Sequence, residues 1–284
     1  MTLTGRDGNA LAADSGGPAD GPPVVLLHGG GQTRHSWAGT WRVLVESGWR
    51  ALSLDMRGHG DSAWVADGDY SLDAFAGDTL AVARSLPTPP ILVGASLGGL
   101  SSLVAIAESP EPSQTARALV LVDVAHRMEE SGRDRIGDFM TGNLAGFASL
   151  EEAADAISAY NPHRPRPKDL SGLAKNLRQH EDGRWHWHWD PAFVQGKFGS
   201  PDETRASVVE PDRLARAVDR LEVPTLLVRG RSSDLLSEDG AREFLERVPH
   251  AEYADVAGAG HMVAGDRNEV FNNAILDFLE RNRA

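Results

Sequence analysis

Short, unbroken apolar runs recur along the chain, with longer amphipathic stretches between them. Strands that are buried on both faces of a sheet show such runs, and their alternation with helices predicts a mostly parallel sheet with helices on both faces. The expected strands cover residues 24–27, 51–54, 91–93, 118–122 and 225–228. The expected helices cover residues 37–47, 72–86, 97–108, 238–247 and 268–280. The fold class is therefore α/β.

No comparable strand run appears between about residues 125 and 211. Residues 133–160 instead carry apolar side chains at roughly helical spacing. The part that follows is less regular and combines a proline-rich stretch with a tryptophan-rich one. We therefore expect a core domain made of residues 1–124 and 212–284, with residues 125–211 forming a mainly helical cap (lid) insertion.

The strand at residues 91–93 runs into Gly94-Ala95-Ser96-Leu97-Gly98 and then into a helix. In this G-x-S-x-G pattern the small residues allow a sharp turn that exposes the Ser96 hydroxyl. The new helix also directs its free N–H groups toward the place where an oxyanion would form. The pentapeptide alone is common in ordinary glycine-rich turns, but the flanking strand and helix favour Ser96 as a nucleophile.

A serine hydroxyl needs a base, and the base needs an acid that fixes its tautomer. The best placed of the histidines is His261, on a late loop after a strand-like segment at residues 252–256. For the acid we prefer Asp234, on the loop after the strand at residues 225–228, although an aspartate there often only caps a helix. Asp123, at the end of the strand at residues 118–122, is the alternative acid.

Two backbone N–H groups are needed to hold the oxyanion. One belongs to the residue after the nucleophile, Leu97, and the other should come from an early loop. The sequence His28-Gly29-Gly30-Gly31 follows the first buried strand directly, and Gly30 is the expected second donor. A phosphate-binding loop fits poorly, because the G-x-x-x-x-G-K-[ST] pattern is missing.

These motifs resemble those of the α/β-hydrolase superfamily, in its serine-nucleophile, esterase- and lactonase-like branch. The resemblance extends over nearly the whole chain and includes Trp37, nine residues after His28, and the segment at residues 55–62. It implies a structural role for residues 55–62 and a cap that selects the substrate. Related epoxide hydrolases and haloalkane dehalogenases use aspartate as nucleophile, so Ser96 indicates attack on an acyl carbon.

We therefore expect a serine hydrolase that cleaves a small carboxylic ester, a lactone or a related acyl bond through an acyl-enzyme. The alternatives are C–C bond hydrolysis, acyl transfer, cofactor-free perhydrolysis, or a small-molecule receptor with slow turnover. Neither a metal nor an organic cofactor is implied.

Three indoles in the cap are candidate substrate-binding groups. In an extended strand, Trp185, Trp187 and Trp189 would share one face, with His186 and His188 on the other. An aromatic packing face is favoured over direct substrate contact. The two histidines lack the further ligands of a metal site.

The composition and net charge of the chain limit the classes of partner that it is expected to bind. The net charge of −13 disfavours nucleic acid and anionic membranes, so a small-molecule substrate is expected. Cysteine is absent from the sequence, which excludes disulfides and thiolate chemistry. The N-terminal segment resembles no signal peptide, and the apolar runs are far shorter than the roughly 20 residues of a membrane span. These features predict a cytoplasmic protein; the sequence leaves its oligomeric state open.

Overall fold

The computed structural model describes residues 1–162, 166, 168–198, 210–260 and 268–283. Its central sheet has the strand order β1-β2-β4-β3-β5-β6-β9-β10. All neighbours from β4 to β10 are parallel, whereas β1 and β2 are added antiparallel at one edge. The strands are β1 (Thr2–Thr4), β2 (Ala10–Gly16), β3 (Pro23–Leu27), β4 (Arg50–Leu54), β5 (Ile91–Ala95), β6 (Ala118–Val122), β9 (Thr225–Gly230) and β10 (Glu252–Val256).

Every strand and helix expected in the core is present, with small shifts at the ends. The segment at residues 37–47 forms a short 3₁₀ helix, η1 (Arg34–Trp37), followed by α1 (Ala38–Glu46). The other core helices are α2 (Leu72–Arg84), α3 (Leu97–Ala107), α4 (Pro112–Thr115), α8 (Pro211–Asp219), α9 (Glu238–Arg247) and α11 (Asn268–Arg281). The sequence pattern did not reveal β1, β2, α4 or α8, which are short or polar.

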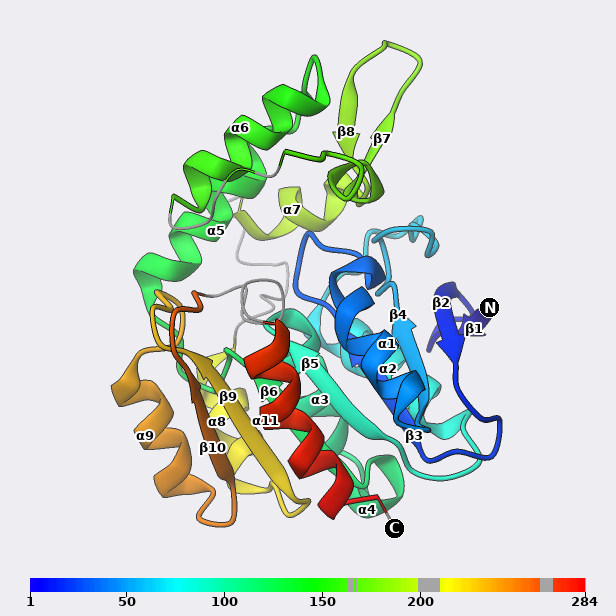
Figure 1. Cartoon of the computed structure of the whole chain (residues 1–284), viewed down its shortest axis with the longest axis vertical. Coiled ribbons are helices and arrows are strands. Elements are labelled where there is room, and N and C mark those ends of the chain that lie inside the picture. Colours follow the sequence, from blue (N-terminus) through cyan, green and yellow to red (C-terminus); the bar gives the residue numbers. More distant parts are fainter. Residues whose placement is uncertain (163–165, 167, 199–209, 261–267, 284) are drawn as a thin grey trace.

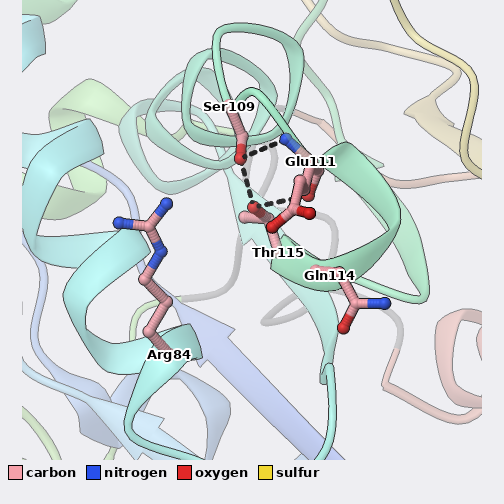
Figure 2. Close-up of a pocket in the computed structure, with 5 residues that line it drawn as sticks. All are labelled: Arg84, Ser109, Glu111, Gln114 and Thr115. Atoms are coloured by element: carbon pink, nitrogen blue, oxygen red, sulfur yellow. Dashed lines mark hydrogen bonds between the residues drawn. The ribbon is translucent and has the colours of Figure 1, made fainter.

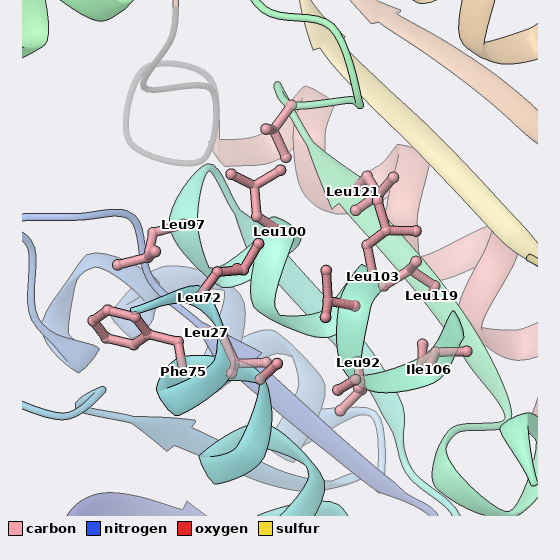
Figure 3. Close-up of a cluster of buried hydrophobic side chains, with 14 of the residues drawn as sticks. Leu27, Leu72, Phe75, Leu92, Leu97, Leu100, Leu103, Ile106, Leu119 and Leu121 are labelled. Atoms are coloured by element: carbon pink, nitrogen blue, oxygen red, sulfur yellow. The ribbon is translucent and has the colours of Figure 1, made fainter. Parts of the chain in front are cut away.

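Helices cover both faces of the sheet, as the alternation of runs predicts (Figure 1). Side chains of α1 and α11 pack on one face, and those of α2, α3, α8 and α9 pack on the other. Successive residues of one strand contribute to both faces, because side chains alternate across a strand. Leu26 belongs to the first cluster, on the side of α1 and α11, and Leu27 to the second cluster, on the side of α2, α3, α8 and α9. Figure 3 shows the second cluster, in which leucines of α3 meet those of β3, β5 and β6.

The segment between β6 and β9, which we call the cap, lies beyond the ends of the parallel strands (Figure 1). It contains α5 (Glu130–Gly142), α6 (Leu150–Tyr160), η2 (Leu173–Asn176), β7 (Leu177–Gln179), β8 (Trp185–Trp187) and α7 (Pro191–Phe198). The β7–β8 hairpin is an antiparallel pair that the sequence pattern did not predict. Helix α8, which follows, packs Leu214 and Val218 into the core. Within the described ranges no helix is both long and apolar enough to cross a membrane.

Candidate active site

Ser96 lies at the turn from β5 into α3, where the sequence predicted a nucleophile. Its φ of 47° falls in the left-handed region, which a residue with a side chain seldom adopts. The neighbouring glycines make this turn possible. A β-carbon added to Gly94 would lie 2.3 Å from the Gly98 carbonyl oxygen, and one added to Gly98 would lie 2.4 Å from the Leu27 oxygen. The strained backbone holds the half-buried Ser96 side chain at the end of the sheet.

Asp123 occupies the corresponding position at the end of the neighbouring strand. In the ladder between β5 and β6, Ala95 is opposite Val122, so Ser96 and Asp123 leave the sheet side by side. Asp123 also has a positive φ, 52°, and it is fully buried. Within the described residues, Ser96 and Asp123 are the two non-glycine positions with positive φ. Strain at two adjacent strand ends is typical of a functional site.

The two candidate acids have different surroundings. The Asp123 carboxylate accepts hydrogen bonds from the Gly230 N–H, at 2.9 Å, and from the Ser233 hydroxyl, at 2.5 Å. The Asp234 carboxylate forms an ion pair with Arg135 of the cap helix α5, and its side chain is 40% exposed. The geometry therefore favours the alternative acid, Asp123, over the preferred one, and it gives Asp234 a contact with the cap instead.

His261 lies outside the described residues. The described chain leading to it runs beside the end of β9, where Ser232 N–H donates to the Ala259 oxygen at 2.9 Å. A β-carbon added to Gly230 would lie only 2.2 Å from the Gly260 oxygen. Because Gly230 also donates to Asp123, the chain reaches residue 260 next to the buried carboxylate.

The two expected oxyanion donors lie on adjoining segments. A β-carbon added to Gly29 would be 3.4 Å from Ser96 Cβ, and one added to Gly30 would be 3.9 Å from Leu97 Cδ2. Within the described part of the chain, neither the Gly30 nor the Leu97 N–H donates a hydrogen bond. The neighbouring amides are occupied: Gly29 N–H donates to Gln32 Oε1 and Gly31 N–H to His59 Nε2. As far as the described residues are concerned, two backbone donors beside Ser96 are therefore available.

Two buried histidines fix the glycine loop. His28 Nε2 accepts from the Met56 N–H at 3.0 Å, so its Nδ1 carries the proton and donates to the Gly29 oxygen. Burial lowers the pKa of His28 and keeps the ring neutral. His59 in turn accepts the Gly31 N–H at 3.0 Å. The segment at residues 55–62, expected to be structural, thus also orients the glycine loop.

The same segment anchors the cap to the core. The Gly60 N–H donates to the His188 oxygen at 2.7 Å, and the Asp190 N–H donates to the Gly58 oxygen at 2.7 Å. The buried Tyr70 hydroxyl donates to the Asp190 carboxylate at 2.5 Å. These contacts join residues more than 100 positions apart, so no local sequence pattern could have indicated them.

The cap surrounds the glycine loop with apolar side chains. A β-carbon on Gly30 would lie 3.2 Å from Phe193 Cζ, and one on Gly31 would lie 3.0 Å from Met140 Cε. Trp189, 3% exposed, packs against Phe193 and lies beside Gly31. The cap side chains Met140, Trp189 and Phe193, which lie beside the glycine loop, are therefore all apolar.

The three cap indoles do not form one surface at the site. Trp187 packs edge-on against Phe139 and Phe147, in the interior of the cap. Trp185 belongs to the small separate core of the cap, and its backbone pairs with that of Phe147. Trp189 is thus the indole nearest the glycine loop, and the other two pack within the cap.

The pocket drawn in Figure 2 belongs to another part of the molecule. It has a volume of about 420 Å³ and is lined by Arg84 together with polar residues between Ser109 and Thr115. Arg84 ends α2, and the residues from Ser109 to Thr115 follow the C-terminal end of α3, whereas Ser96 precedes the N-terminal end of α3. Among the described residues, no group of three His, Asp or Glu side chains lies close enough together to hold a metal ion.

Comparison with known proteins matches the sequence to one family. The model of the alpha/beta hydrolase family matches residues 24–274. The chain is 34% identical to esterase Rv0045c of Mycobacterium tuberculosis, over 91% of this chain and 83% of that protein. It is 28% identical to the 3-hydroxybutyrate-oligomer hydrolase of Cupriavidus necator, over 87% of this chain and 84% of that one.

A solved structure supports the fold. The crystal structure of E-2-(acetamidomethylene)succinate hydrolase superposes with a TM-score of 0.84, over 99% of each chain, at 22% sequence identity. At this identity the likeness concerns the fold alone. The family match extends over most of the sequence and includes the strained serine turn and the glycine loop. The chain belongs to the alpha/beta hydrolase family.

Proposed function

We propose that the chain is a carboxylic ester hydrolase in which Ser96 is the nucleophile, His261 the general base and Asp123 the acid. The observation that carries the proposal is the strained, adjacent placement of Ser96 and Asp123 at the ends of β5 and β6. The esterase and oligoester hydrolase among the relatives support ester cleavage. The resemblance to the superfamily supplies the role of His261.

The chemistry follows from the positions of these groups. Ser96 Oγ attacks the acyl carbon while His261 takes its proton, and the Asp123 carboxylate stabilises the imidazolium that forms. The oxygen that becomes negative accepts hydrogen bonds from the Gly30 and Leu97 N–H groups. The ester C–O bond then breaks, and the imidazolium gives its proton to the departing alcohol, leaving an acyl-enzyme. His261 then takes a proton from a water molecule, which attacks the acyl-enzyme and releases the carboxylic acid and free Ser96.

The substrate that we propose is a small, largely apolar ester or lactone. Met140, Trp189 and Phe193 surround the glycine loop that would hold the acyl oxygen. Apolar walls with a few fixed polar donors are typical of small-molecule sites. We propose no metal or organic cofactor, since the serine, its base and the backbone donors supply every step.

Burst kinetics test this function. With a chromogenic short-chain ester, we expect rapid release of about one equivalent of alcohol per chain, followed by continued turnover. A screen of esters, lactones and thioesters, read as kcat/KM, then ranks the acyl bonds. A protein that stops after a single turnover would be a receptor, and one that hydrolyses none of these substrates would contradict the proposal.

Trp189 is expected to affect substrate choice, whereas Trp185 should not. Trp189→Ala removes an apolar wall beside Gly31, so kcat/KM should change unevenly, by roughly 5- to 150-fold, among acyl groups of different size. Trp185→Ala is the matched control, because this indole lies in the separate core of the cap. Thermal unfolding of both variants separates a specificity change from partial unfolding. A common drop in rate for every substrate with the Trp189 variant would give this indole a purely structural role.

A further inference from the structure

Ser233 lies on the loop between β9 and α9 and contacts Asp123. Its Oγ is 2.5 Å from Asp123 Oδ2, 3.1 Å from the Leu235 nitrogen and 3.2 Å from the Leu236 nitrogen. The sequence pattern indicated its neighbour Asp234 as a candidate acid but indicated no role for Ser233.

The direction of each hydrogen bond follows from what the groups can donate. The two backbone N–H groups of Leu235 and Leu236 are donors only, so they occupy the two lone pairs of the Ser233 hydroxyl. The single hydroxyl proton is then directed to the Asp123 carboxylate. The 2.5 Å distance is in the range of a hydrogen bond to a charged oxygen.

The loop that carries Ser233 is held from both sides. On the side of the sheet, Arg229 Nε donates a hydrogen bond of 2.8 Å to the Leu236 oxygen. On the side of the cap, the Glu129 N–H donates a hydrogen bond of 2.9 Å to the Leu235 oxygen. A β-carbon added to Gly132 would lie 2.3 Å from the Asp234 oxygen, so α5 packs directly on the loop backbone. The Ser233 hydroxyl is therefore fixed before substrate binds.

We propose that Ser233 is a positioning residue that acts through Asp123. Ser233 holds Oδ2 while the Gly230 N–H holds Oδ1 at 2.9 Å, so the two hydrogen bonds fix the plane of the carboxylate. In the proposed mechanism this carboxylate stabilises the imidazolium of His261, so its orientation bears on the reaction. This inference rests on the proposed role of Asp123 as the acid.

The first test compares three variants. Ser233→Ala should lower kcat by about 10- to 100-fold, the effect of losing a hydrogen bond to a charged group, with KM nearly unchanged. Ser233→Thr, which keeps a hydroxyl, should restore most of the loss. Ser232→Ala is the matched control on the exposed neighbouring serine and should retain wild-type kcat. A Ser233→Ala enzyme with wild-type kcat would overturn the inference.

A double-mutant cycle with Asp123→Asn separates this inference from the proposed function. If Ser233 acts through Asp123, adding Ser233→Ala to Asp123→Asn should lower kcat no further. An additional 10- to 100-fold loss in the double variant would mean that Ser233 acts independently, which would contradict the inference. If Asp123→Asn alone keeps its activity, the acid assignment fails, and the inference about Ser233 fails with it. The thermal unfolding midpoint of each variant identifies any that lose activity by unfolding.

Discussion

Replacing Ser96 by alanine is expected to lower kcat by about 10⁴-fold or more, because the variant cannot form the acyl-enzyme. The fold should survive, since the glycines at positions 94 and 98 that permit the turn are retained. The backbone donors Gly30 and Leu97 also remain, so a small residual rate above that in water is expected. The measurement is kcat on the best ester of the screen, together with the yield of burst-phase alcohol, which should fall to zero.

Alanine tolerates a φ of 47° no better than serine does, so the backbone strain at position 96 remains and the stability should change little. Ser101→Ala is a suitable control, because this serine lies on α3, the helix that begins directly after Ser96, but is fully buried, with its hydroxyl bonded to the Gly98 oxygen. A Ser96→Ala enzyme with full activity would show that another residue is the nucleophile.

The second large effect should come from Asp123. Asp123→Asn keeps the shape of the side chain but removes the charge that stabilises the imidazolium, so kcat should fall by about 10³- to 10⁴-fold. The matched variant Asp234→Asn removes an exposed ion pair with Arg135, and such pairs contribute little, so kcat should change by about fivefold or less. Steady-state kinetics of both variants on one substrate gives the ranking.

Asp123→Asn also places an amide where two donors point at a carboxylate, so some loss of stability is expected. Its thermal unfolding should be compared with that of Asp234→Asn. The opposite ranking in kcat, with Asp234→Asn more damaging in folded protein, would return the acid to Asp234.

The sequence by itself determined the sheet and the turn that carries Ser96, the proposed nucleophile, because both depend on local patterns. Unbroken apolar runs such as residues 118–122 have one stable environment, a strand covered on both faces. The turn at Ser96 requires glycine at positions 94 and 98, where any β-carbon would collide with backbone oxygens. The glycine loop at Gly30 is likewise visible in the sequence, since the loop follows a buried strand directly.

The preference for Asp123 over Asp234 as the proposed acid comes only from the tertiary structure. Both follow strands whose carboxyl ends meet at one edge of the sheet, so chain position does not distinguish them. The two carboxylates differ in orientation. That of Asp123 is buried and accepts hydrogen bonds from Gly230 and Ser233, whereas that of Asp234 forms an ion pair with Arg135. Side-chain direction depends on which groups the fold brings together from distant positions, here 107 and 110 residues away from Asp123. The anchoring of the cap by Tyr70 and Asp190 has the same origin, because a hydrogen bond between residues 120 positions apart leaves no local pattern in the sequence.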